Sequence, residues 1–181
     1  IRPRDWSSDV CSSDLGLIQS FSVCENYILN CYDEEPFTQK GVFSRAKMLE
    51  YGERLTEEYD VRPRTPQALA RSFSGGNQQK IIIAREFARE PQFIIAVQPT
   101  RGLDIGASEF VHKKLLEAKK RGVGVLLISA DLDEILAVAD RALVLSEGQI
   151  MGEFSQGETD YAKIGMMMGG MKAGQKEGET A

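Results

Sequence analysis

The sequence predicts an α/β fold whose second half holds a mainly parallel sheet and whose first half is helical. Phe93–Val97 is a continuous apolar run, which is typical of a parallel strand that is buried on both faces. Strand and helix patterns then alternate up to residue 154, as they do in α/β domains. Ahead of residue 73, by contrast, only helical patterns occur.

The helical first half begins with a capping motif. Ser22 and Glu25 form S-x-x-E ahead of apolar residues, and this pairing satisfies two free amides at a helix start. We expect a helix of about ten residues after it. A second amphipathic helix is expected over 45–59, behind a potential N-cap at Ser44. Two prolines after that helix disfavour regular structure before the next motif.

The second half is predicted to alternate between helices and strands. Pro91 ends a helix whose apolar body is Ile81–Ala88. The elements expected beyond it are the strand Phe93–Val97, a helix over 107–120, a strand over 123–129, a helix over 132–139, and strands over 142–146 and 149–154 that are joined by a turn at Glu147-Gly148. Residues 155–181 are expected to form a short helix and a flexible tail.

Residues 1–15 differ in texture from the rest of the chain. Ser-Ser-Asp occurs twice there, and no helical or strand period surrounds it. The stretch resembles the translated read-through of a sequencing adapter, so we predict that it is non-native and exclude it from the fold. Trp6 and Cys11 would then contribute nothing to folding. The alternative is a disordered native tail.

Composition disfavours several functional classes. The chain has 22 Lys and Arg against 27 Asp and Glu, a net charge of −5, so there is no basic excess to hold nucleic acid or anionic lipid. The longest apolar run is far shorter than the ~18 residues that span a bilayer. The three cysteines lack zinc-site spacing, so we expect no structural zinc and a reducing compartment.

The most informative segment is Ser72–Lys80, in which a hydroxyl and two glycines precede a strongly helical run. Free amides at a helix start attract anions, and the macrodipole contributes about 0.3–1 kcal/mol for a negative charge there. Taken alone, the same residues also suit an ordinary turn with an N-cap.

The neighbouring motifs narrow this choice. The apolar strand Phe93–Val97 follows, and directly after it comes the loop Gln98-Pro99-Thr100-Arg101-Gly102-Leu103-Asp104. Over residues 17–154, this order of motifs resembles the second half of an ATP-binding-cassette (ABC) ATPase domain. The resemblance implies that Phe73 to Asn77 match the signature motif, that Phe93 to Gln98 is the Walker B strand, that Arg101 to Asp104 is the D-loop, and that Ala130 stands at the switch-histidine position. The candidate binding residues here are Ser74, Gly75, Gly76, Asn77 and Gln78, which are called the signature segment below, together with Asp104.

The resemblance also implies a domain plan. Residues 16–73 would be the helical subdomain, and residues 74–154 the C-terminal half of a RecA-like P-loop NTPase core. The strings N-Q-Q-K and Q-P-T-R-G-L-D-I-G-A look like the second cassette of tandem-cassette importers for simple sugars and nucleosides. The helix sequence E-F-V-H-K-K-L-L-E and the string A-x-Q-P-T-R-G-L-D bring the nucleoside branch closest.

Parts of the catalytic machinery are missing from this sequence. No glycine is followed by lysine, so there is no Walker A motif, and the family places that motif upstream. Val97 and Gln98 occupy the positions at which the family has Asp and Glu, and an amide cannot take a proton from water. Loss of a general base costs about 10²–10⁴ in rate. With Ala130, these strand-end positions suggest a degenerate cassette, and random decay is the alternative.

By the resemblance, Ser74, Gly75 and Gly76 would bind the γ-phosphate of ATP, with its Mg²⁺, in the site of a partner cassette. Asn77 and Gln78 would position them. The implied partners are the first cassette of the same full-length chain or a second copy, membrane permease subunits and, indirectly, a substrate-binding protein, with no nucleic acid.

The implied location is peripheral, on the cytoplasmic face of the membrane. The chain alone is expected neither to bind ATP tightly nor to hydrolyse it. The alternatives are a non-transport ABC ATPase and a stand-alone interaction module without nucleotide chemistry.

Overall fold

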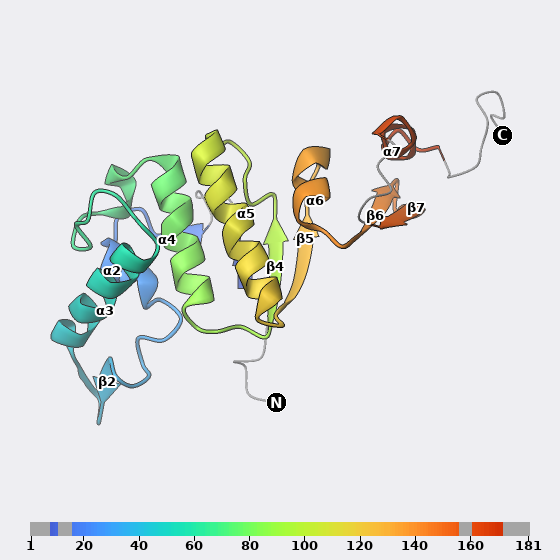
Figure 1. Cartoon of the computed structure of the whole chain (residues 1–181). Coiled ribbons are helices and arrows are strands. Elements are labelled where there is room, and N and C mark those ends of the chain that lie inside the picture. The colour runs from blue at the N-terminus through green and yellow to red at the C-terminus, as the bar shows by residue number, and fades with distance from the viewer. Residues whose placement is uncertain (1–7, 11–15, 156–160, 172–181) are drawn as a thin grey trace. The chain divides into compact units, whose positions relative to one another are not determined.

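The computed structural model describes residues 8–10, 16–155 and 161–171 (Figure 1). The chain divides into two compact units, Ile1–Ala130 and Asp131–Ala181. The first contains the helical part and a parallel sheet, and the second contains a β-hairpin with two helices.

The helical part begins as the sequence predicts and then departs from it. α2 (Val23–Tyr27) starts at a complete capping box in which Ser22 and Glu25 bond each other's backbone amides. It has five residues rather than about ten, because i→i+3 bonds replace the α-helical pattern after Ile28. α3 (Arg45–Glu58) begins after its predicted N-cap, Ser44.

α2 and α3 pack closely at one glycine. A Cβ added to Gly52 of α3 would lie 2.6 Å from Cys24 Sγ of α2, which is closer than real Cβ contacts come. Cys24 and Cys31 are both buried free cysteines. The helical part therefore has a core of its own, in which Cys24, Ile28, Cys31, Phe37 and Met48 pack together.

Between α2 and α3 lies a hairpin that the sequence analysis missed. β2 (Thr38–Gln39) and β3 (Val42–Phe43) pair antiparallel across a turn at Lys40-Gly41. Both turn residues have positive φ, 49° and 79°, which is the type I′ geometry of two-residue hairpins. The strands have two residues each, so they leave no alternating pattern in the sequence.

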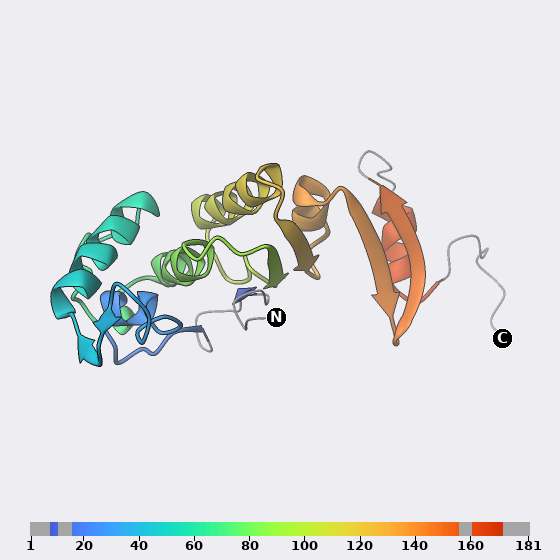
Figure 2. The same cartoon turned by 90° about the horizontal axis from the view of Figure 1, so that it is seen from below.

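The parallel sheet of the first unit has the order β1-β4-β5. β4 (Phe93–Val97) has the predicted bounds, and β5 (Gly124–Ile128) lies within the predicted run. α4 (Gly75–Phe87) precedes β4, and α5 (Ile105–Lys120) crosses from β4 to β5. The 3₁₀ turn η2 (Ala70–Ser72) leads into α4. Figures 1 and 2 show α4 and α5 side by side.

The two faces of this sheet differ in burial. Ile94 and Ala96 of β4 are fully buried. On the alternate positions, Phe93 is 40% exposed, and Leu126 and Ile128 of β5 are 45% and 47% exposed. A parallel sheet normally has both faces covered, so the described residues leave one apolar face of β4 and β5 open.

One prediction about the first fifteen residues is wrong. Ser8–Val10 forms β1, which pairs in parallel with Ile94–Ala96 of β4, although 1–15 was excluded from the fold. Edge pairing uses backbone N–H and C=O groups, so it requires no apolar period in the added strand. Trp6 and Cys11 lie outside the described residues. That the segment is non-native stays a prediction.

The second unit is a hairpin with a helix on either side of it in sequence. α6 (Leu132–Val138) starts at an Asp131 N-cap, and β6 (Arg141–Ser146) and β7 (Gln149–Ser155) pair antiparallel. α7 (Tyr161–Met168) follows, so the short terminal helix is confirmed, and its predicted tail beyond 171 lies outside the described residues. The core contains Val144, Met151, Phe154, Ile164 and Met167.

The predicted hairpin turn is confirmed, whereas the mainly parallel sheet is confirmed only in part. Glu147 and Gly148 have φ of 47° and 74°, again the type I′ geometry. A two-residue turn pairs β6 with β7, and these two strands form a separate two-stranded sheet. Within the described ranges, parallel pairing involves β1, β4 and β5 alone.

Candidate functional site

The N-terminus of α4 is open at the residues that the sequence analysis singled out. Ser74 precedes the helix with an extended backbone (φ −62°, ψ 157°), and its side chain makes no capping hydrogen bond to the helix. Ser74 and Gly75 are both exposed. A Cβ built on Gly75 would meet nothing within 4 Å. The first turn of α4 therefore presents backbone amides and a hydroxyl to an incoming group.

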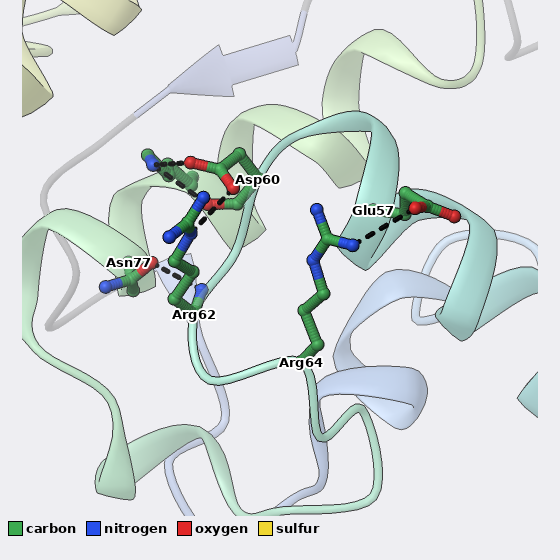
Figure 3. Close-up of polar contacts among 6 residues, drawn as sticks. Glu57, Asp60, Arg62, Arg64 and Asn77 are labelled. Carbon is green, nitrogen blue, oxygen red and sulfur yellow. Dashed lines mark hydrogen bonds and ion pairs between the residues drawn. The ribbon is translucent and has the colours of Figure 1, made fainter.

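Asn77 bridges Ser74 to a loop of the helical part. Its Nδ2 donates to Ser74 Oγ at 3.0 Å. Its Oδ1 accepts from the backbone N–H of Arg62 at 2.8 Å (Figure 3). The side chain of Asn77 is thus held on one side by the backbone and contacts the predicted phosphate-binding hydroxyl on the other.

Gln78 holds the segment that leads into the helix. Its Nε2 donates to the carbonyl of Phe73 at 2.9 Å and to that of Ala70 at 3.3 Å. Its Oε1 accepts from Gln19 Nε2 at 3.1 Å. These bonds connect the first turn of α4 to η2 and to the start of the helical part, and Gln78 itself points to protein partners.

Asp104 lies beside the glycines of the signature segment. It is the N-cap of α5, and its Oδ1 accepts from the Ala107 amide at 2.9 Å. A Cβ built on Gly76 would lie 3.6 Å from Asp104 Oδ2 and 3.0 Å from Ala107 Cβ. The starts of α4 and α5 therefore meet at Gly76, where a larger residue would crowd α5.

The strand-end positions lie at the carboxyl ends of β4 and β5: Val97 is the last residue of β4, Gln98 follows it, and Ala130 comes after β5. Val97 pairs with Ile128, and the backbone N–H of Gln98 donates to the Ile128 carbonyl at 2.8 Å. Gln98 has a positive φ of 48°. Ala130 is exposed two residues beyond β5. None of the three side chains ionises, so none of them can supply a general base.

No family model matches the chain. The guanosine import ATP-binding protein NupO of Bacillus subtilis is 45% identical over 166 residues, which are 92% of this chain and 32% of that protein. The nucleoside import ATP-binding protein NupA of Lactococcus lactis is 45% identical over 155 residues, 86% of this chain and 31% of that protein. The chain belongs to the family of ABC importer ATP-binding proteins. It spans about a third of the length of these curated relatives.

Solved ABC cassettes have the same fold. The dimeric, post-hydrolysis structure of the ATP-binding cassette MJ0796, bound to ADP and Pi, matches with a TM-score of 0.68 and 25% identity. The match covers 84% of this chain and 64% of that one. The described fold is thus part of an α/β ABC cassette.

The sequence analysis missed a group of residues beside the signature segment of this ABC chain. At the end of α3, Arg62 Nε donates to Asp60 Oδ1 at 2.8 Å, and Lys80 Nζ of α4 donates to the Asp60 carbonyl at 2.9 Å. The hydrogen bond from Arg62 is the main reason that the pKa of Asp60 is lowered. Lys80 is 20 residues from Asp60, and Arg62 is 15 residues from Asn77, so no local pattern reveals these contacts.

Two properties of the described residues bear on cofactors and membranes. They contain no group of three or more His, Cys, Asp or Glu side chains that could hold a metal ion. None of their helices combines the length and the apolar character that crossing a bilayer requires.

Proposed function

We propose that this chain is part of a second, degenerate cassette of an ABC importer and that its signature segment completes the ATP site of a partner cassette. The observation that carries this proposal is the open start of α4. Ser74 is exposed there without capping its own helix, and Gly75 has free space in front of it. A residue that only ended a turn would be expected to cap the helix, as Ser22 and Ser44 do.

The residues at this helix start fit a phosphate group. Ser74 Oγ can donate to a phosphate oxygen, and the amides of Gly75 and Gly76 can do the same because no side chain of their own stands in front of them. The helix macrodipole adds about 0.3–1 kcal/mol for a negative charge. ATP would supply the phosphoryl group whose transfer to water releases the free energy that drives transport.

The strand-end positions would leave this cassette's own site silent. In the family the strand-end aspartate would help to hold Mg²⁺, and the glutamate after it would polarise the attacking water. Val97 and Ala130 can do neither, and Gln98 cannot accept a proton from water. The Walker A lysine, the Mg²⁺ ligands and the general base would therefore come from the partner cassette, and Mg²⁺ would lie with the nucleotide in that composite site.

The finer functional assignments are part of this proposal. The fold would be the C-terminal half of a RecA-like core, with the helical subdomain at 16–73. Permease subunits would bind the cassette at the cytoplasmic face of the membrane. We propose nucleosides as the substrate class, with simple sugars as the second choice, because NupO and NupA carry guanosine and nucleoside import in their names.

Ser74→Arg in the complete importer tests the composite site. The bulky cation would fill the space in front of Gly75, so we expect ATP hydrolysis and substrate uptake to fall together by about 10²-fold, which is the cost of losing one transition-state donor. Ser20→Arg is the matched control, since Ser20 is exposed on the same unit outside the site. Unchanged hydrolysis and uptake in Ser74→Arg would refute the proposal.

A further inference from the structure

We propose that the turn Asp60–Arg62, fastened by Lys80, positions Ser74 through the side chain of Asn77. Asp60 and Lys80 would then be positioning residues for phosphate binding, although neither belongs to the signature segment. The inference rests on the proposed function, because it concerns the hydroxyl that would bind the phosphate. Four steps of geometry carry it.

The contact with Arg62 fixes the orientation of the Asn77 side-chain amide. A backbone N–H can only donate, so the Asn77 atom that lies 2.8 Å from Arg62 N must be the oxygen. The amide nitrogen then faces Ser74 Oγ, 3.0 Å away, and donates to it. The contact with Arg62 therefore decides which end of the amide Ser74 meets.

The orientation of the Asn77 amide determines what the Ser74 hydroxyl can bind. Ser74 Oγ accepts a hydrogen bond from Asn77, so its single hydrogen is left to donate elsewhere. An incoming group must then present an acceptor, as a phosphate oxygen does. If the amide were reversed, its oxygen would compete for that hydrogen and the hydroxyl would be turned toward the protein.

Contacts of the turn Asp60–Arg62 hold the backbone N–H of Arg62 in place. Lys80 Nζ donates to the Asp60 carbonyl at 2.9 Å and lies 3.5 Å from the Asp60 carboxylate. The same carboxylate accepts from Arg62 Nε at 2.8 Å. Val61, between them, is completely buried. The turn is thus fixed by its buried residue and by a cation on the helix that carries Asn77.

The side chain of Lys80 is itself held in place by its surroundings. Its side chain is only 18% exposed, and Nζ lies 4.9 Å from the centre of the Phe110 ring on α5. A half-buried ammonium with an aromatic face behind it has little freedom to leave the Asp60 carbonyl. The turn, the signature helix and α5 are therefore connected at one cation.

A neighbouring ion pair lacks these connections and provides a control (Figure 3). Arg64 NH1 lies 3.1 Å from Glu57 Oε1, and the two side chains are 55% and 74% exposed. The pair lies on the same loop and α3, and no bond from it to Asn77 is found among the described residues. An exposed pair of this kind contributes little to stability.

A double-mutant cycle in the complete importer tests the proposal. Lys80→Met releases the turn, so we expect ATP hydrolysis to fall about fivefold, the factor for one hydrogen bond. In a Ser74→Ala background, the same substitution should lower hydrolysis by less than about twofold, because the hydroxyl it acts through is gone. Asp60→Asn should repeat the pattern with a smaller drop, and it serves if Lys80→Met fails to fold.

Several outcomes would refute the inference. If Lys80→Met and Asp60→Asn lower hydrolysis equally with and without the Ser74 hydroxyl, their role is merely structural and the inference is wrong. It is also wrong if neither lowers hydrolysis, or if Arg64→Met lowers it as much as Lys80→Met. If Ser74→Ala alone has no effect, the proposed function fails and this inference fails with it.

Discussion

At the start of α4, side chains that can form hydrogen bonds are held by contacts from other elements. At the carboxyl ends of β4 and β5 the backbones of the two strands are paired, yet the side chains of Val97, Gln98 and Ala130 carry no ionisable group. The backbone N–H of Gln98 still donates to the Ile128 carbonyl, so the backbone pairing extends one residue beyond β4. Strand pairing uses backbone groups, so it does not require a particular side chain at these positions, provided that the residue is not proline.

The two regions therefore differ in their side chains rather than in their backbone. At the signature end the backbone is held and the side chains can bind a ligand, because Ser74 is exposed and Asn77 is held in one orientation. At the strand end the backbone is held, but the side chains lack ionisable groups. The proposed composite ATP site would account for this difference, since it needs the signature segment of one cassette and the strand-end residues of the other. Substitutions at the two ends should therefore differ greatly in their effect.

The largest effect is expected for Gly75→Leu. A Cβ built there meets nothing within 4 Å and the position is exposed, so we expect the substitution to leave the stability of the chain nearly unchanged. It would occupy the space proposed for phosphate, and we expect ATP hydrolysis by the complete importer to fall about 10²-fold. Thermal denaturation and a phosphate-release assay measure the two quantities.

Gly165→Leu is the matched control for Gly75→Leu. Gly165 also lies in a helix with open space around it, outside the candidate site. The control should leave hydrolysis within about twofold of the parent protein. Equal losses in the two variants, or none in Gly75→Leu, would contradict the contrast between the two ends of the site.

A smaller effect is expected for Asp104→Ala, which removes the N-cap of α5. Loss of such a cap costs about 1 kcal/mol of unfolding free energy, so the urea midpoint of the chain should fall. Asp104→Asn should retain most of the stability, because an asparagine oxygen also accepts from the Ala107 amide. An equal loss in both variants would mean that the carboxylate's charge, rather than its capping bond, stabilises the start of α5.

Local patterns predicted much of this fold. The capping box at Ser22, the N-cap at Ser44, the strand Phe93–Val97 and the turn at Glu147-Gly148 all rest on chemistry within a few residues, and the structure contains each of them. The fold failed to follow the sequence pattern where tertiary pairing decides, as in β1, which adds to an edge without any apolar period of its own.

The candidate site shows the same limit. Ser74 and the glycines were identified from their own motif, whereas the contribution of Arg62 was not, because it acts through a backbone N–H that every non-proline residue carries. The Lys80 contact with Asp60 spans 20 residues and joins two elements. The proximity of Gly76 to Asp104 likewise depends on how α4 packs beside α5. Such contacts follow from packing rather than from a sequence motif.

The smallest effect is expected at the strand end, for Gln98→Ala and Gln98→Glu. Alanine removes an amide that cannot act as a base, and hydrolysis by the complete importer should change by less than about twofold. Glutamate restores a carboxylate, yet Val97 and Ala130 still provide neither a metal ligand nor an imidazole, so no gain is expected. Both variants keep the backbone bond between the residue 98 amide and the Ile128 carbonyl, so stability should also be retained. A tenfold change in either direction would show that this end takes part in catalysis after all, and the contrast with the signature end would then be wrong.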